Sequence, residues 1–242
     1  MKLSAGYTCS GLSQPNRMSR GRRIARIKLV TPSPQAAQKH LLDWDNRSLF
    51  HNPEKYPALT PENLFQSSSP IVLEIGCGTG EFLISSAAAQ PKDYFIGVEI
   101  SRRAIYHAVN QSEIASLDNI KFIKADIRLL YPLMKPGSWQ MIHLNYPDPN
   151  YSAGRRKHRI FDNRFLDASH MALTTDGQIS VVTDQLTFLQ DMLEIAENDQ
   201  RFGKTHEERY REGFSPAQKT RFQQAWDRYQ RTNYYFTLRK NT

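Results

Sequence analysis

The sequence contains only two cysteines, Cys9 and Cys77, which lie far apart and in no spacing typical of metal ligands. This scarcity argues against a disulfide framework and a zinc site, so we expect no metal. The chain also lacks a run of about 18 apolar residues, which argues against a membrane span. Because the N-terminus has no apolar stretch of the kind found in signal peptides, we expect a protein of the reducing cytoplasm.

Acidic residues are missing from the first 30 positions, which hold seven lysines and arginines. The rest of the chain has 25 Lys and Arg against 24 Asp and Glu, so most of the net charge of +8 belongs to this N-terminal segment. An arginine-rich segment without acids favours contact with a polyanion such as nucleic acid. A solvated tail and an organelle transit segment have similar composition and stay open as alternatives.

The chain divides into three parts by composition. Residues 1–22 are expected to form a basic, flexible and partly disordered arm. Residues 23–70 hold six of the 13 prolines and are expected to be irregular but packed on the main domain through aromatic side chains. Residues 71–242 alternate strand and helix patterns, which predicts an α/β fold with a doubly wound, mostly parallel sheet. The expected strands are 71–75, 93–100, 119–126, 139–145, 178–184 and 232–238, and the expected helices are 81–90, 102–117, 163–173 and 186–198.

A glycine-rich turn follows the first of these strands. The apolar run 71–75 leads directly into Gly76, Gly78 and Gly80, and a helical pattern begins at Glu81. Glycines at such a place let the backbone turn sharply and let a ligand approach closely. The GxGxG spacing differs from the GxGxxG of dinucleotide-binding proteins.

Three carboxylates accompany the turn and favour S-adenosylmethionine (SAM) as the ligand. Glu99 ends the next predicted strand, where its two oxygens can accept both hydroxyls of an adenosine ribose. Glu74 suits a cationic centre or an amino group, whereas a pyrophosphate would prefer bare amides. Asp126 falls where it can contact the edge of an adenine. An NAD site and a purely structural turn are the weaker alternatives.

A second group of residues follows the fourth predicted strand, in the sequence Asn145-Tyr-Pro-Asp-Pro149. Two prolines fix the backbone around Asp148 and so aim one carboxylate from the strand end. The basic run 155–159 comes a few residues later and is suited to phosphate groups. The alternative is an ordinary solvated loop.

Together these motifs resemble the bacterial tRNA (guanine-N7-)-methyltransferases, and the resemblance covers residues 71–242. It is carried by Glu-Ile-Gly-Cys-Gly-Thr-Gly at 74–80, Gly-Val-Glu at 97–99, Ala-Asp at 125–126, Tyr-Pro-Asp-Pro at 146–149, Arg-Ile at 159–160 and Val-Thr-Asp at 182–184. The resemblance implies a Rossmann-like class I methyltransferase with a seven-stranded type of sheet. It also implies SAM as cofactor, tRNA as partner, methylation of N7 of guanosine 46 in the variable loop, and a monomer or homodimer.

The resemblance implies roles for individual residues. Asp148 matches the active-site residue and also a cofactor contact. The other cofactor-binding positions are Glu74, Gly76, Gly78, Gly80, Glu99, Asp126 and Asn145. The substrate-binding positions are Ser152, Arg155, Lys157, Arg159, Asp184, Thr220 and Gln223.

Two positions on the substrate side depart from the family pattern. Gln223 stands where the C-terminal Thr-x-Phe/Tyr-Glu motif has glutamate, although Thr205 and Glu208 offer a second match closer to Asp184. Ser152 stands where a lysine is usual. A paralogue that methylates another RNA or a guanine-like compound, an exocyclic-amine methyltransferase and a non-catalytic RNA-binding module are therefore retained as alternatives.

Three further side chains are of types that can act as a general base or a nucleophile, but we expect simpler roles for them. Guanine N7 carries a free lone pair, so methylation there needs no general base. His143 is therefore expected to be packed within its strand, and His158 to contact phosphate. Cys77 is expected to fill a small buried space rather than act as a nucleophile.

Overall fold

The structure is a computed structural model that describes residues 27–150, 154, 158–214, 216, 218–220, 223–224 and 231–241. The predicted arm, residues 1–22, lies outside the described residues, as do three of the predicted substrate contacts: Ser152, Arg155 and Lys157. None of the helices in the described part of the chain is both long and apolar enough to cross a membrane.

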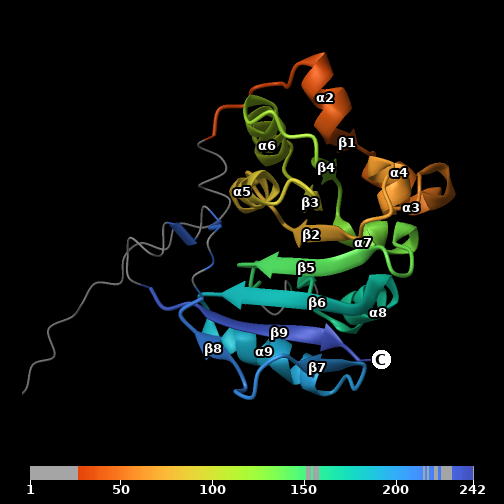
Figure 1. The fold of residues 1–242 in the computed structure, drawn as a ribbon. Helices are drawn as coiled ribbons and strands as arrows, with labels where there is room; N and C mark the ends of the chain where they lie inside the picture. Colours follow the sequence, from red (N-terminus) through yellow and green to blue (C-terminus); the bar gives the residue numbers. More distant parts are fainter. Residues whose placement is uncertain are drawn as a thin grey trace, which may run out of the picture.

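A twisted sheet forms the centre of the molecule (Figure 1). Its main strand order is β1-β4-β3-β2-β5-β6-β9-β7, and β8 pairs with β9. Strands β1 to β6 pair in parallel, and β9 runs antiparallel to β6, β7 and β8, which confirms the predicted mostly parallel sheet. The strands are β1 (Leu41–Asp43), β2 (Ile71–Ile75), β3 (Tyr94–Glu99), β4 (Ile120–Lys124), β5 (Trp139–Asn145), β6 (Leu173–Thr183), β7 (Phe202–Lys204), β8 (Arg211–Glu212) and β9 (Tyr234–Lys240).

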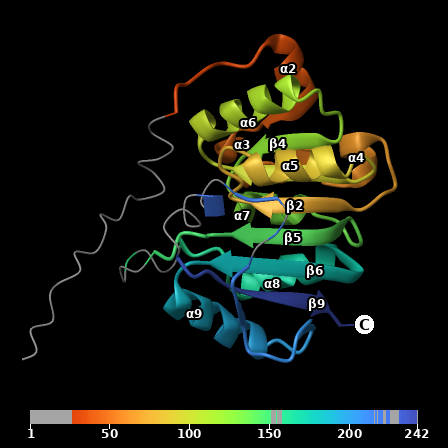
Figure 2. The same cartoon turned by 60° about the vertical axis from the view of Figure 1, so that its left-hand side comes forward.

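Helices cover both faces of the sheet, as Figures 1 and 2 show. One face carries α2 (Pro34–His40), α5 (Glu81–Ala89) and α6 (Arg102–Ile114), which enclose a core with alternate residues of β2, β3 and β4. The other face carries α3 (Asn46–His51), α4 (Pro61–Phe65), α7 (Ile127–Leu130), α8 (Asn163–Ala172) and α9 (Leu186–Glu197). Two short 3₁₀ turns, η1 (Pro53–Lys55) and η2 (Tyr131–Leu133), complete this layer.

Strand β2 shows why the sequence places it at the centre. All five of its residues are buried. Ile71, Leu73 and Ile75 enter the core on the α8 side, whereas Val72 enters the core on the α5 side. A strand buried on both faces is typical of a parallel sheet covered by helices on each side.

From residue 27 onward, where the structure describes it, most of the segment before β2 is regular, which corrects the irregular structure predicted for residues 23–70. Residues 34–65 form three helices, a 3₁₀ turn and strand β1, which pairs with β4 at the sheet edge. The prolines misled the prediction because they begin helices rather than break them. Ser33 caps α2 with Pro34 in its first turn, and Thr60 caps α4 with Pro61 in the same place. Proline is well suited to the first turn, where the amide hydrogen has no partner within the helix.

Two other differences concern β6 and the C-terminal half. β6 begins at Leu173 rather than Gln178, but its pairing with β5 jumps from Trp139–Leu173 to Met141–Gln178. The register of the two strands shifts between these pairs, and the part of β6 that lies there contains Gly177. The short strands β7 and β8 were not predicted, since two or three residues are too few to show an alternation of apolar and polar side chains.

Candidate functional site

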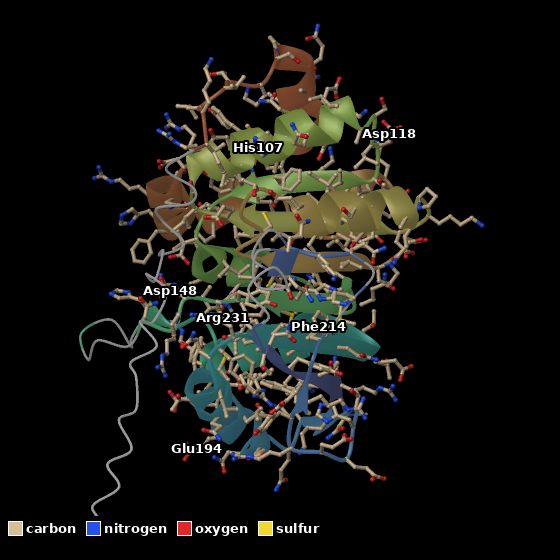
Figure 3. All side chains as sticks on the ribbon, turned by 90° about the vertical axis from the view of Figure 1, so that its left-hand side faces the viewer. His107, Asp118, Asp148, Glu194, Phe214 and Arg231 are labelled. Carbon is tan, nitrogen blue, oxygen red and sulfur yellow. The ribbon has the colours of Figure 1, made fainter. Side chains whose placement is uncertain are left out.

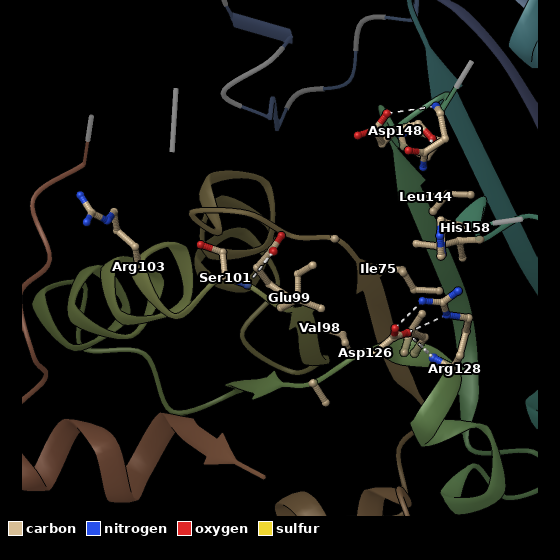
Figure 4. A pocket seen from close by; sticks show the side chains of 17 residues that line it. Ile75, Val98, Glu99, Ser101, Arg103, Asp126, Arg128, Leu144, Asp148 and His158 are labelled. Atoms are coloured by element: carbon tan, nitrogen blue, oxygen red, sulfur yellow. Dashed lines mark hydrogen bonds and ion pairs between the residues drawn. The ribbon is translucent and has the colours of Figure 1, made fainter. Parts of the chain in front are cut away.

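A cavity of about 700 Å³ opens at the C-terminal ends of β2 to β5, where parallel sheets bind their ligands (Figure 4). It brings together four of the predicted site residues: Gly76, Glu99, Asp126 and Asp148. Apolar side chains at the strand ends form the walls. These are Ile75, Val98, Ala125, Ile127 and Leu144.

The glycine turn has the backbone geometry that the sequence predicted. Gly76, Gly78 and Gly80 have φ values of 71°, 58° and 80°, in the left-handed region that favours glycine. A Cβ added to Gly80 would lie 2.9 Å from the Cβ of Ala108 in α6, so this glycine also permits close packing of the turn on that helix. The turn is therefore fixed both by backbone conformation and by packing.

Glu99 is 8% exposed and lines the cavity from the end of β3. Its carboxylate accepts a hydrogen bond from the Gly78 amide at 3.1 Å and another from the Ser101 amide at 2.9 Å. These contacts tie the glycine turn to the start of α6. Each carboxylate oxygen has two lone pairs, so one remains on each oxygen for a ligand hydroxyl.

Asp126 follows β4 and caps α7 by accepting a hydrogen bond from the Arg128 amide at 3.0 Å. The Arg128 guanidinium also donates to both of its carboxylate oxygens, with Nε 2.9 Å from Oδ1. Burial would raise the pKa of Asp126, but the hydrogen bonds and charge of Arg128 outweigh it and lower the pKa below its usual value. The carboxylate is therefore ionised at the rim of the cavity (Figure 4).

Glu74 and Asn145 form a buried pair beneath the glycine turn. The Asn145 amide donates to Oε1 of Glu74 at 2.9 Å, and the two residues are 2% and 5% exposed. This bond joins β2 to β5 at their C-terminal ends. Glu74, Asn145, Gly78 and Gly80, four predicted cofactor contacts, are not among the residues that line the cavity.

The loop that carries Asp148 is held in a strained conformation. Tyr146 and Asn150, which flank the Pro-Asp-Pro sequence, have φ values of 50° and 43° without being glycines. Such conformations cost of order 1–3 kcal/mol each and concentrate at functional sites. The Tyr146 amide is fixed by the Val182 carbonyl of β6 at 2.7 Å, and the Asn150 amide donates to Oδ1 of Asp148 at 3.1 Å. The exposed Asp148 carboxylate is thus aimed at the cavity by its own loop.

Arg159 is engaged within the protein. Its Nε donates to the Pro149 carbonyl at 2.8 Å, its Nη1 lies 2.7 Å from Oδ2 of Asp191, and its guanidinium stacks 4.6 Å above the Phe188 ring. These contacts anchor the end of the Asp148 loop to α9. The structure therefore gives this predicted substrate contact a positioning role toward Pro149.

The remaining predicted substrate residues lie on separate segments. Asp184 directly follows β6, and its Oδ2 accepts from Gln185 at 2.9 Å and from Arg231 at 3.4 Å. The Thr220 hydroxyl accepts a hydrogen bond from the backbone amide of Gln223. The Gln223 side chain is 1% exposed and donates through Nε2 to the Phe214 carbonyl at 2.6 Å. None of these three lines the large cavity.

The second candidate for the C-terminal motif lies elsewhere. The Thr205 hydroxyl donates to the Thr237 carbonyl of β9 at 3.4 Å, and the Glu208 carboxylate pairs with Arg211 at 3.0 Å. Both contacts are local to the edge of the sheet formed by β7, β8 and β9.

Several residues that line the cavity were not predicted. They are Ile100, Ser101, Arg103, Arg128, Pro147, Asn150 and Ile160. Most follow a predicted acid within four residues, because the chain rounds the rim of the cavity after leaving each strand. Proximity in sequence to Glu99, Asp126 and Asp148 is therefore the overlooked signal for most of them. His158, predicted to contact phosphate, also lines the cavity.

The cavity fits S-adenosylmethionine. Its volume lies in the range of small-molecule sites, and its apolar walls suit an adenine ring. Glu99 retains acceptor capacity for ribose hydroxyls. Asp126 and Asp148 add negative charge, which matches a sulfonium and an amino group. Among the described residues, no group of three or more His, Cys, Asp or Glu side chains is placed to hold a metal ion.

Comparison with solved structures identifies the class of fold. The chain is similar to TrmN from Thermus thermophilus, with 18% identity and a TM-score of 0.51 over 74% of this chain and 46% of that chain. It is equally similar to a 30S ribosomal A1408 methyltransferase from an uncultured bacterium, with 14% identity and a TM-score of 0.51 over 74% and 91% of the two chains. These likenesses show that the chain has the fold of the class I methyltransferases.

Sequence comparison identifies the family. Residues 68–236 match the model of a family described as "Putative methyltransferase". A tRNA (guanine-N(7)-)-methyltransferase of Rubrobacter xylanophilus is 41% identical over 90% of this chain and 97% of that protein. Another protein of that name, from Chloroherpeton thalassium, is 35% identical over 91% and 98% of the two chains. The chain belongs to the tRNA (guanine-N7-)-methyltransferase family.

Proposed function

We propose that this protein transfers the methyl group of S-adenosylmethionine to N7 of a guanosine in tRNA, with guanosine 46 of the variable loop as the target. The observation that carries the proposal is the Asp148 carboxylate, exposed on a strained loop at the rim of a cavity that fits the cofactor. The names of relatives that align over nearly the whole chain support the choice of substrate.

The residues suit a reaction that needs no base. Bound S-adenosylmethionine supplies an electrophilic methyl group on a cationic sulfur. Guanine N7 has a free lone pair and becomes cationic on methylation, so the chain must orient the base and stabilise positive charge. Asp148 is placed to do both, because its carboxylate can accept a hydrogen bond from the guanine edge and oppose the growing charge. The unprotonated state of Asp126 adds negative potential to the same cavity.

The other site residues divide into two groups in this proposal. Glu99 and Asp126 contact the cofactor, while Glu74, Asn145 and the glycine turn shape the floor beneath it. Asp184 and the basic run 155–159 face the tRNA, with Arg159 acting through the Pro149 carbonyl. The basic residues 1–22 add phosphate contacts, and the enzyme acts in the cytoplasm as a monomer or homodimer.

Nucleoside mass spectrometry tests the proposal. Unmodified tRNA would be incubated with the full chain and SAM that carries a labelled methyl group, then digested to nucleosides. We expect labelled 7-methylguanosine, and none from a tRNA in which guanosine 46 is replaced by adenosine. Labelled N6-methyladenosine or N2-methylguanosine would instead identify an exocyclic-amine methyltransferase.

A binding measurement separates the enzyme from a non-catalytic module. Calorimetry with S-adenosylhomocysteine should show a single site on the full chain. Absence of binding would contradict the assignment of the cavity, whatever the RNA affinity.

A further inference from the structure

A second cavity, of about 520 Å³, lies on the face of the sheet that α5 covers. It is enclosed by the middle of β5, the first residues of β6, helix α5 and the segment around Phe214, and Figure 3 shows Phe214 in front of the sheet. Among the described residues, none lines both this cavity and the cofactor cavity. The proposed methyl transfer leaves this second cavity without a role.

His143 of β5 lines this cavity. Its Nδ1 is buried and has no hydrogen-bond partner among the residues that the structure describes. Its ring packs edge-on against Phe82, with centroids 4.8 Å apart at 70°. A buried polar atom without a partner costs roughly 1–3 kcal/mol, so native proteins rarely keep one without a reason. Burial lowers the pKa of His143 to about 4, so the ring is neutral near pH 7.

The walls combine flat apolar surfaces with neutral amides. Three phenylalanines line the cavity: Phe214, and Phe82 and Phe95, which are 8% and 1% exposed. Four glutamine side chains, Gln90, Gln140, Gln178 and Gln218, add hydrogen-bond donors and acceptors. Aromatic faces bind planar rings by stacking, and primary amides match the paired donors and acceptors at the edge of a nucleobase.

The described residues that line the cavity offer little to a phosphate group. Among the described lining residues there is no lysine or arginine, and the one ionisable acid is Asp176. Among these described residues an anion would meet a carboxylate and a neutral imidazole, which do not offset its desolvation. They therefore favour an uncharged group over an anion.

We propose that this cavity is a second binding site, which takes an uncharged nucleobase that stacks on the aromatic walls and hydrogen-bonds His143 and the glutamine amides. The base comes either from a free nucleoside or from an unpaired position of an RNA strand. The site is independent of the methyl-transfer site, and its test does not depend on catalysis.

Saturation-transfer NMR on the full chain tests the proposal with adenosine, guanosine, cytidine and uridine as probes. S-adenosylhomocysteine is present in excess, so that the cofactor cavity is occupied. We expect at least one nucleoside to receive saturation and to be displaced by its own excess. The 5′-monophosphate of the same nucleoside should bind more weakly, because the described lining residues supply no Lys or Arg to pair with the phosphate.

Two variants and one control locate the binding. His143→Phe keeps a ring against Phe82 but removes the nitrogen, and Gln178→Ala removes one amide. Each should weaken nucleoside binding about tenfold, the effect of one lost hydrogen bond. His143→Phe should also leave the thermal midpoint unchanged or raised, since it removes an unpartnered polar atom. Gln111→Ala, on the exposed face of α6, should change neither property.

The source of the base follows from tRNA affinity, measured by filter binding. Equal tenfold losses of tRNA and nucleoside affinity in His143→Phe identify a base of the bound RNA. Unchanged tRNA affinity identifies a free nucleoside. The proposal is overturned if no nucleoside binds beside S-adenosylhomocysteine, or if both variants bind as the unaltered chain does.

Discussion

Replacing Glu99 with glutamine tests whether one carboxylate both fixes the glycine turn and shapes the cofactor site. Glu99 accepts hydrogen bonds from two backbone amides, those of Gly78 and Ser101, and is almost fully buried. Glutamine has nearly the same shape, but only one of its two terminal atoms accepts. One amide therefore loses its partner, and the other keeps a weaker, neutral bond.

The expected loss of stability follows from these two bonds. Hydrogen bonds to a charged group contribute about 1.5–3 kcal/mol, and a buried donor without a partner costs about 1–3 kcal/mol. We expect Glu99→Gln to lower the free energy of unfolding by about 2–3 kcal/mol. For a domain of this size that corresponds to a fall in the thermal midpoint of about 4–12 °C. Affinity for S-adenosylhomocysteine should fall at least tenfold, because a ribose hydroxyl also loses an acceptor.

Urea unfolding and calorimetric titration measure the two effects separately. Glu194→Gln is the matched control, since Glu194 is exposed on α9 (Figure 3) and its side chain lies outside the site. It should change the unfolding free energy by less than about 0.5 kcal/mol. An unaltered urea midpoint in Glu99→Gln would show that the hydrogen bonds from the two backbone amides to Glu99 do not stabilise the turn. Unaltered cofactor affinity would remove Glu99 from the binding site.

Three further changes probe other parts of the site. Asp148→Asn should lower the rate of methyl transfer about 10²–10³-fold in single-turnover assays. The thermal midpoint should stay within about 2 °C, because the side chain is exposed. An unchanged rate would refute the catalytic assignment. Gly80→Ala should destabilise the fold by about 2–4 kcal/mol in urea titrations, because both the positive φ and the contact with Ala108 penalise a Cβ. Gly137→Ala is the control: its φ is 70° but the space around it is open, so it should cost only about 1–2 kcal/mol. The folded-state pKa of Asp126 is lowered, so its stabilising effect is present above the unfolded-state pKa and is lost as pH falls through the folded-state pKa. Asp126→Asn should therefore destabilise the protein at pH 7, and this effect should shrink as the pH falls through the folded-state pKa. An effect that does not change with pH would contradict the ionised state.

The core strands were predictable because burial on both faces leaves a continuous apolar run. Residues 71–75 were predicted as a strand with the bounds that β2 has. The segment before β2 was not predictable in the same way, since the meaning of its prolines depends on position. Pro34 and Pro61 follow Ser33 and Thr60, and that pairing of a cap with a proline was the overlooked signal for two short helices.

The ligand-binding end of the sheet was predictable from the order of acids, but the contacts of those acids were not. Each acid follows a strand, so parallel pairing alone brings Glu99, Asp126 and Asp148 to one cavity. Whether a carboxylate meets a ligand or another part of the chain depends on residues distant in sequence. Asn145 lies 71 positions from Glu74, yet it is the partner that turns Glu74 into a buried link between β2 and β5.

Gln223 shows how a departure from a family motif acquires a structural reason. Its amide nitrogen donates to the Phe214 carbonyl at 2.6 Å from a side chain that is 1% exposed, and Asn233 donates to the same carbonyl at 3.1 Å. A glutamate in this place would set a buried carboxylate oxygen against a carbonyl oxygen, with no proton between them. Glutamine is therefore the residue that this packing of the C-terminal segment requires. The same Phe214 lines the second cavity, so the altered position bears on the shape of that cavity rather than on Asp148.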